Sequence, residues 1–143
     1  MPRLPRYVLP PEGVYHVTSR GVARAPIVLD DEDSLIFLTL LAREVRREGW
    51  NVHAFCLMPN HYHLILATTL AQLSRGLHRL NGEFALGFNE RHGRWGHLFG
   101  ERFAAFVIRD ENHLARASEY VLQNPVRAGL SEFAKDWAWS GPR

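Results

Sequence analysis

The chain has 143 residues, 46% of them hydrophobic and 22% charged, with a formal net charge of +2 and a pI near 9.0. This composition is that of an ordinary folded protein and excludes a low-complexity or repeat-built chain. The length predicts one domain over residues 1–143, with residues 1–12 as an extended N-terminal lead-in because prolines cluster there.

The cysteine content and the absence of long apolar segments indicate in which cellular compartment the protein is expected. Cys56 is the single cysteine, so an intramolecular disulfide cannot form, which suits a reducing environment. The N-terminus lacks the apolar core of a signal peptide, and no segment reaches the about 18 apolar residues of a membrane span. We therefore expect a cytoplasmic protein.

The first half of the chain shows strand and helix patterns in turn. Residues 14–20 alternate in side-chain character and are rich in β-forming residues, which predicts a strand. The acidic residues 30–33 precede an apolar run with helical spacing that ends at Gly49, which predicts a helix. Two short apolar runs, 52–57 and 62–67, predict two strands joined by a tight connection.

The second half continues the alternation. From Leu70, apolar residues recur every three or four positions and predict an amphipathic helix despite three internal glycines. Residues 91–100 predict a polar loop, 102–109 a strand, and 111–124 a helix ended by Pro125. The order predicts an α+β fold: a ferredoxin-like, split β-α-β antiparallel sheet with helices on one face, plus a C-terminal helix. RNA-binding modules, small enzymes and regulatory domains share this arrangement, so the fold alone does not decide the function.

A His-x-His pair is the sharpest chemical feature. A strand places every second side chain on the same face, so His61 and His63 lie together while Tyr62 points the other way. Two adjacent imidazoles can bind one metal ion. A bare pair of this kind is equally consistent with two unrelated polar residues on a solvated sheet face.

Tyr120 and Asn124 form a second candidate pair. Their spacing on the predicted last helix places a phenol and an amide on one face, one turn apart. A phenol can act as a nucleophile and an amide oxygen as a metal ligand. The alternative is that Tyr120 packs against the sheet and Asn124 merely ends the helix.

The two pairs fit one chemistry. A phenol with a pKa near 10 is a poor nucleophile at neutral pH, so its attack on a phosphodiester needs a cation at the phosphate. Nitrogen ligands favour later transition metals, whereas phosphate chemistry and cellular abundance favour Mg²⁺ or Mn²⁺.

The predicted loop after the second helix combines cations with aromatic residues. Arg94, Trp95, His97 and Arg102 suit a single-stranded nucleic acid, because cations follow phosphates and aromatic rings stack on bases. The alternative is a solvated loop anchored by two aromatic residues. Further cations outside the apolar stripes are candidates for extending a basic face: Arg20, Arg24, Arg75, His78, Arg79 and Arg127.

Four motifs together resemble the REP-associated tyrosine transposases of bacteria, which are single-tyrosine enzymes with a His-hydrophobe-His (HUH) motif. The resemblance rests on residues 15–21, 56–64, 93–103 and 120–129, and extends from about residue 13 to Ser140. It departs from many relatives at Val22 and Ala23, at Gly100 and Ala104, and in a short C-terminal segment.

The resemblance implies a function and a set of roles. His61, His63 and Asn124 would bind a divalent ion, and Tyr120 would attack single-stranded, hairpin-forming DNA to leave a 5′-phosphotyrosine and a free 3′-hydroxyl. No nucleotide cofactor would be needed, and a monomer is favoured over a homodimer. Three other functions stay open: a non-catalytic nucleic-acid-binding module, a phosphoesterase that uses water, and a dormant relative that regulates through DNA binding.

Overall fold

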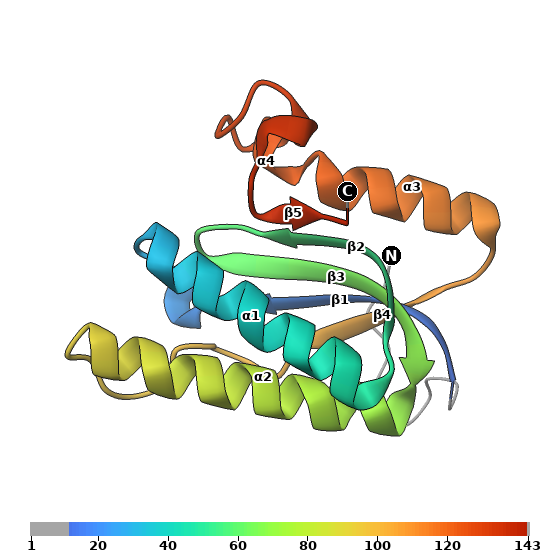
Figure 1. Cartoon of the computed structure of the whole chain (residues 1–143). Coiled ribbons are helices and arrows are strands. Elements are labelled where there is room, and N and C mark those ends of the chain that lie inside the picture. Colours follow the sequence, from blue (N-terminus) through green and yellow to red (C-terminus); the bar gives the residue numbers. More distant parts are fainter. Residues whose placement is uncertain (1–11, 143) are drawn as a thin grey trace.

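The structure is a computed structural model that describes residues 12–142, so the predicted lead-in lies almost entirely outside the described residues. Its centre is a five-stranded antiparallel sheet in the order β4-β1-β3-β2-β5 (Figure 1). The strands are β1 (Glu12–Arg20), β2 (Asn51–Leu57), β3 (His61–Thr69), β4 (Ala104–Ile108) and β5 (Ser140–Gly141).

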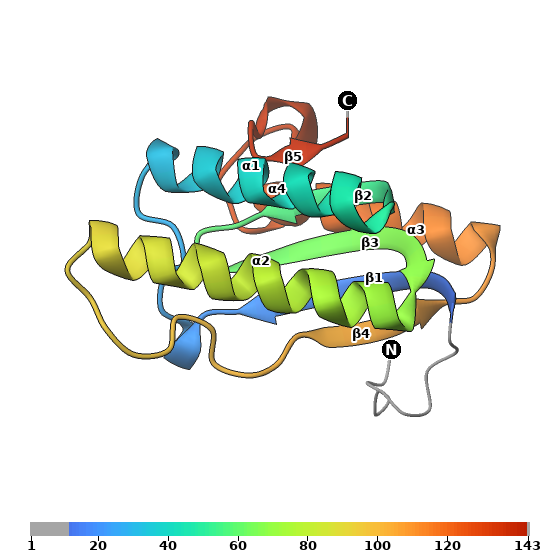
Figure 2. The same cartoon turned by 60° about the horizontal axis from the view of Figure 1, so that its bottom comes forward.

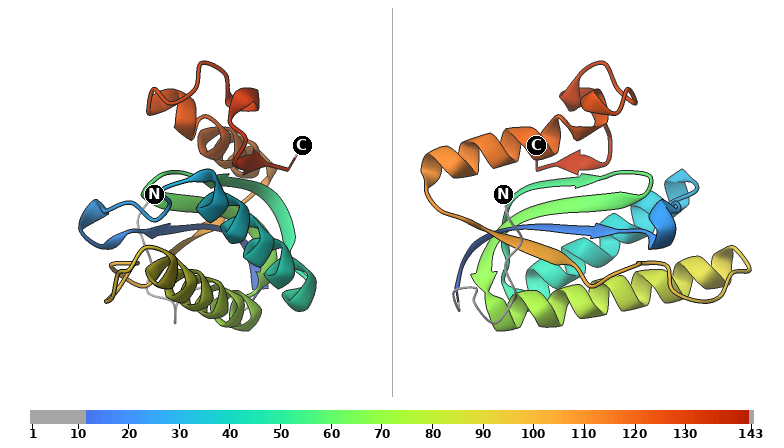
Figure 3. Two further views of the ribbon diagram at one scale, coloured as in Figure 1. Left: turned by 60° about the vertical axis from the view of Figure 1, so that its left-hand side comes forward. Right: turned by 180° about the vertical axis from the view of Figure 1, so that it is seen from behind.

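Helices lie on both faces of this sheet. The two long helices, α1 (Asp31–Glu48) and α2 (Leu70–Arg91), run side by side across one face (Figures 1 and 2). The helix α3 (Glu111–Leu122) crosses the opposite face, and the short α4 (Asn124–Arg127) follows it (Figure 3). Two 3₁₀ turns, η2 (Val22–Arg24) and η3 (Ala134–Asp136), complete the elements. The predicted α+β, ferredoxin-like fold is confirmed.

The period of the strands explains this two-sided arrangement. In β1, Tyr15 and Val17 point into the larger core beneath α1 and α2, while His16 points to the other face. In β3, Leu64 and Leu66 join the same core, whereas Ile65 lies in a smaller core beneath α3. The alternation therefore directs one set of side chains to the long helices and the other to α3.

The helix ends follow from their capping residues. Asp30 accepts a hydrogen bond from the Asp33 backbone, Thr69 from that of Gln72, and Asp110 from that of His113, so each helix begins at a capped N-terminus. Gly49 closes α1 with a φ of 67°, a conformation that favours glycine.

A buried ion cluster joins the two long helices. Glu44 and Glu48 of α1 are nearly inaccessible to solvent. Arg79 Nη2 lies 2.8 Å from Glu44 Oε1 and also contacts Glu48, while Arg75 Nη2 lies 2.8 Å from Glu48 Oε1. Arg75 and Arg79 therefore neutralise buried carboxylates and are not free cations on a basic face.

Close packing explains why α2 has a glycine at position 76, one of three glycines inside this helix. A Cβ atom there would lie 2.3 Å from the Trp50 ring, whereas one at Gly82 would meet nothing within 4 Å. We expect Gly76→Ala to lower the free energy of unfolding by about 1–3 kcal/mol through overpacking. The matched change Gly82→Ala is expected to raise it by about 0.5–1 kcal/mol through helix propensity. Denaturant unfolding of both variants tests the packing, and an equal response would contradict it.

Three local features differ from the sequence prediction. The helix predicted over 111–124 ends at Leu122, and Pro125 does not terminate it but occupies the first turn of α4, where a missing N–H has no cost. The strand predicted over 102–109 is limited to β4. The two-residue β5, which pairs with β2, is too short to leave a pattern. Within residues 12–142, no helix combines the length and apolar character needed to cross a membrane.

Candidate active site

Three histidines gather on the sheet face that α3 covers. His63 and His61 come from β3 and share one face, as the period of two predicts, and His16 comes from the neighbouring β1. The ring centroids of His61 and His63 are 5.0 Å apart, and those of His16 and His63 are 5.1 Å apart. His16 and His63 are buried, with exposed fractions of 8% and 9%. The predicted pair of His61 and His63 therefore lies on a covered face of the sheet and is not a solvated feature of an open one.

Tyr120 of α3 lies above this histidine cluster. Its ring centroid is 6.3 Å from that of His63 and 6.5 Å from that of His16. Ala117 and Val121 of the same helix fill the core beneath α3, while Tyr120 remains 53% exposed. Tyr120 is thus not one of the residues that pack the helix, and its phenol stays accessible to a ligand.

Asn124 brings an amide to the same place. Its Nδ2 lies 3.3 Å from His61 Nε2. Because α3 ends at Leu122, Asn124 reaches the cluster from the first residue of α4 and not from the same helix as Tyr120. Rotation of the carboxamide exchanges its nitrogen and oxygen, so this position can present an oxygen ligand beside His61.

Burial sets the protonation of the three histidines. It lowers the pKa of His16 to about 4, with the neighbouring His113 adding to the effect. Burial, then the charge of Arg20, lowers the pKa of His61 to about 4. Burial, then His16 and His61, lowers the pKa of His63 to about 3. The imidazoles are therefore neutral at pH 7 and keep the lone pairs that a metal ion requires, so the donor set fits a divalent ion.

These lowered pKa values predict how stability depends on pH. A histidine whose folded-state pKa lies below its unfolded value of about 6.5 favours unfolding when protons become available. The contribution of these histidines to the free energy of unfolding is fully present above about pH 6.5 and is lost as the pH falls toward 4. We expect the melting temperature to drop by several degrees across this range, and less so in the His16→Gln/His63→Gln double variant, as differential scanning calorimetry would measure. A drop of the same size in the double variant would contradict this assignment.

Two arginines supply positive charge around the cluster. The guanidinium carbon of Arg127 lies 3.9 Å from the centroid of the Tyr120 ring, and its Nη2 donates to the Tyr120 carbonyl at 2.7 Å. Arg20 is exposed at the end of β1, opposite His61 in the strand register. Both charges reach the cluster, because, after burial and the neighbouring histidines, each contributes to lowering the pKa of His63.

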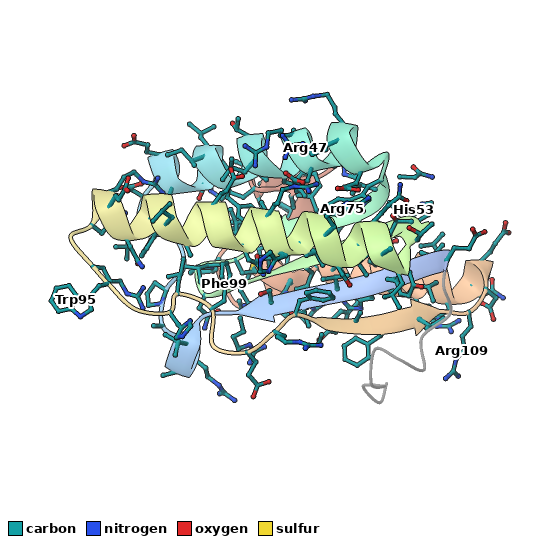
Figure 4. All side chains as sticks on the ribbon, turned by 90° about the horizontal axis from the view of Figure 1, so that it is seen from below. Arg47, His53, Arg75, Trp95, Phe99 and Arg109 are labelled. Atoms are coloured by element: carbon teal, nitrogen blue, oxygen red, sulfur yellow. The ribbon has the colours of Figure 1, made fainter. Side chains whose placement is uncertain are left out.

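The loop after α2 extends from the end of that helix, with Trp95 at its far end and Phe99 between α2 and the sheet (Figure 4). Trp95 is 87% exposed at its tip. Arg94 is held inside the loop, where it donates to Asn89 Oδ1 and to the His97 carbonyl at 2.7 Å each. Arg94 therefore stabilises the conformation of the loop, while Trp95 remains free to contact a ligand.

Two cavities connect the loop with the sheet edge. The larger, about 900 Å³, lies between α2 and residues 96–103 and is lined in part by His97, Phe99 and Arg102. The smaller, about 390 Å³, is lined in part by Arg20, Arg24 and Arg102. Arg102 borders both, so the predicted nucleic-acid-binding residues lead from the loop toward the strand end that carries His61.

A second group of potential metal ligands lies elsewhere among the described residues: Asp30, Asp33 and His92. Asp33 accepts hydrogen bonds from the Leu29 backbone at 2.9 Å, from Arg91 Nε at 3.0 Å and from His92 Nε2 at 2.8 Å. The Arg91 charge already neutralises this carboxylate. Asp33, Arg91 and His92 therefore tie the start of α1 to the end of α2, and the Asp33 oxygens already serve this contact.

Comparison with known proteins is consistent with this fold. Residues 12–124 match the family model described as transposase IS200 like. The match covers most of the chain, so the protein belongs to the IS200-like transposase family, and the predicted resemblance to the REP-associated tyrosine transposases is confirmed.

The relatives differ in how much they share with the chain. A protein of Haemophilus influenzae, described as a REP-associated tyrosine transposase, is 30% identical over 98 residues. That alignment covers 61% of this chain and 56% of the relative's length. The solved structure of a REP-associated tyrosine transposase bound to a REP hairpin matches 98% of this chain and 82% of its own, with a TM-score of 0.71 and 18% identity. A Deinococcus radiodurans protein described as a transposase matches 85% of this chain and 95% of its own, with a TM-score of 0.53 and 18% identity.

Sequence reasoning missed two members of the site, His16 and Asn60. Asn60 Oδ1 lies 2.7 Å from His61 Nδ1, and His16 Nε2 lies 2.9 Å from His63 Nδ1. Both residues stand in motifs that carry the family resemblance. Only the register of β1 against β3 would have placed His16 beside His63, and the sequence contains no signal for that register.

Proposed function

We propose that this chain is a DNA strand transferase that cleaves and rejoins single-stranded DNA through a 5′-phosphotyrosine on Tyr120. One observation carries the proposal: an accessible phenol lies directly above a buried histidine cluster, with Asn124 against His61, all within one chain. A site complete in one chain supports a single-domain enzyme that acts as a monomer. The family membership supports DNA as the substrate.

The reaction exchanges one phosphoester for another. The Tyr120 oxygen attacks the phosphorus, a new bond joins the phosphorus to the phenol oxygen, and the bond to the 3′-oxygen breaks. The phenol gives its proton to water, and the departing 3′-oxygen takes a proton from water as it becomes a hydroxyl. A later attack by a 3′-hydroxyl reverses these changes, so no nucleotide cofactor is consumed.

His61, His63 and Asn124 would hold the divalent ion, Mg²⁺ or Mn²⁺. That ion would supply positive charge to the scissile phosphate as the phenol attacks. Arg127 stacks on the Tyr120 ring and holds its backbone carbonyl, which fixes the direction of the phenol. Arg20, which lies across from His61 at the end of β1, would bind a neighbouring phosphate.

The DNA partner we propose is a single strand that forms a hairpin. The solved relative with the same fold is bound to a REP hairpin. In this chain, Trp95, His97 and Arg102 would contact unpaired bases and phosphates. Because both faces of the sheet carry helices, bases have no open sheet surface on which to stack, which disfavours a module that binds RNA across its sheet.

The proposal is tested with labelled single-stranded DNA that contains a hairpin and a 5′ flank, incubated with the protein and Mn²⁺. We expect a protein–DNA adduct that survives denaturation. Cleavage without an adduct would instead indicate a phosphoesterase that uses water. Binding without cleavage, across varied hairpins and metals, would indicate a dormant DNA-binding relative.

Trp95 tests the role of the loop. We expect Trp95→Ala to weaken single-strand binding by about 5- to 150-fold, because one base–aromatic stack contributes about 1–3 kcal/mol. The control is Leu86→Ala, which removes another exposed apolar side chain, from α2. Fluorescence anisotropy measures both affinities. Equal affinities would remove Trp95 from the DNA interface.

A further inference from the structure

The two proposed histidine ligands each have a hydrogen-bonded partner at Nδ1. Asn60 Oδ1 lies 2.7 Å from His61 Nδ1, and His16 Nε2 lies 2.9 Å from His63 Nδ1. A neutral imidazole carries hydrogen on one nitrogen and a lone pair on the other. The partner at Nδ1 therefore decides whether Nε2 can bind a metal ion.

The orientation of Asn60 follows from its second contact. Asn60 Nδ2 donates to the Arg24 carbonyl at 3.2 Å, and a carbonyl can only accept. The other end of the carboxamide, Oδ1, must then face His61 and can only accept from it. His61 therefore carries its hydrogen on Nδ1, and its lone pair lies on Nε2, the atom nearest Asn124.

The backbone around Asn60 keeps this contact in place. Ala23 and Arg24 have φ values of 51° and 60°, in the left-handed region that non-glycine residues rarely adopt. This turn directs the Arg24 carbonyl at Asn60, and Gly21 N donates to the Asn60 carbonyl at 2.9 Å. A Cβ on Gly21 would lie 2.1 Å from the Ala25 carbonyl oxygen, so glycine permits the close turn.

We propose that Asn60 and His16 are positioning residues that hold His61 and His63 with hydrogen on Nδ1, so that both present Nε2 to one divalent ion. For His63, the proposal requires Nδ1 to donate and Nε2 of His16 to accept across their 2.9 Å contact. The inference rests on the proposed metal site and adds two residues that do not themselves bind the ion.

Metal affinity without DNA is the first test. Isothermal titration calorimetry with Mn²⁺ would compare the unaltered chain with Asn60→Leu and His16→Phe, which keep the side-chain size but remove the acceptor. We expect each to weaken Mn²⁺ binding by about 10- to 100-fold. His16→Gln keeps an acceptor and is expected to stay within about threefold of the unaltered chain, less than the loss of an outer-shell contact produces. Asn60→Asp keeps the acceptor but loses the amide that donates to the Arg24 carbonyl, so its Mn²⁺ affinity should lie between those of Asn60→Leu and the unaltered chain.

Matched controls separate positioning from general damage. Asn51→Leu and His53→Phe make the same chemical changes on β2, outside the histidine cluster, and should leave Mn²⁺ affinity unchanged. If the unaltered chain binds no Mn²⁺, the proposed metal site itself fails. If it binds, and Asn60→Leu and His16→Phe bind equally well, only the positioning inference fails.

Histidine tautomers give a second readout that needs no metal and no activity. Long-range ¹H–¹⁵N spectra of histidine-labelled protein, assigned with His61→Gln and His63→Gln, distinguish hydrogen on Nδ1 from hydrogen on Nε2. We expect hydrogen on Nδ1 at both positions, and a mixture of tautomers at His61 in Asn60→Leu and at His63 in His16→Phe. Hydrogen on Nε2 of either ring in the unaltered chain would overturn the inference.

Discussion

Replacing Tyr120 with phenylalanine is expected to eliminate the covalent protein–DNA adduct and to reduce DNA cleavage by at least about 1,000-fold, as when an enzyme loses its nucleophile. The change removes one oxygen from a half-exposed ring and leaves the packing of α3 on the sheet intact. Mn²⁺ affinity and the melting temperature should therefore stay close to those of the unaltered chain. Gel electrophoresis under denaturing conditions measures the adduct, and product formation over time measures cleavage.

Tyr62→Phe is the matched control for that experiment. Tyr62 stands between His61 and His63 in sequence, but it is buried on the other face, where its hydroxyl donates to Asn81 Oδ1 at 2.6 Å. We expect this variant to lose about 1 kcal/mol of stability and to keep the adduct. Cleavage that persists in Tyr120→Phe would show that water, not the phenol, attacks the phosphate.

The second large effect is expected from the histidine ligands. His61→Ala and His63→Ala each remove a nitrogen donor, so we expect Mn²⁺ affinity and cleavage to fall by more than the about 10- to 100-fold that loss of an outer-shell partner costs. DNA binding should change far less, because the cavity that His97 and Arg102 line is formed by α2 and the loop, and the three histidines of the cluster are not part of its lining. Calorimetry and anisotropy measure the two affinities separately.

His53→Ala is the control for the histidine variants. His53 lies on β2, outside the ring pairs that His16, His61 and His63 form. Its replacement should leave Mn²⁺ affinity and cleavage unchanged. Normal cleavage in His61→Ala or His63→Ala, in the presence of a strong metal chelator, would contradict metal assistance.

Local periodicity accounts for what the sequence revealed about the site. The alternation along β3 was sufficient to place His61 and His63 on one face, and the stripe on α2 outlined the larger core. The sequence predicts that Tyr120 and Asn124 lie on one continuous helix. In the structure, α3 ends at Leu122 and Asn124 belongs to α4. The spacing was informative because α4 follows almost directly and returns Asn124 to the cluster.

Contacts between distant segments could not be predicted. Arg75 and Arg79 resembled free surface cations because their partners, Glu44 and Glu48, lie on another helix. Placing Asn60 opposite the Arg24 carbonyl required the path of the turn around η2. Such contacts depend on tertiary packing, which no pattern within a single element encodes.

The measurement that tests the central claim most directly is peptide mass spectrometry of the protein after reaction with hairpin DNA and Mn²⁺. The account predicts one modified peptide, with a nucleotide joined through its 5′-phosphate to Tyr120, and a released strand that ends in a 3′-hydroxyl. A nucleotide joined through its 3′-phosphate, an attachment to another residue, or cleaved DNA with unmodified protein would contradict it.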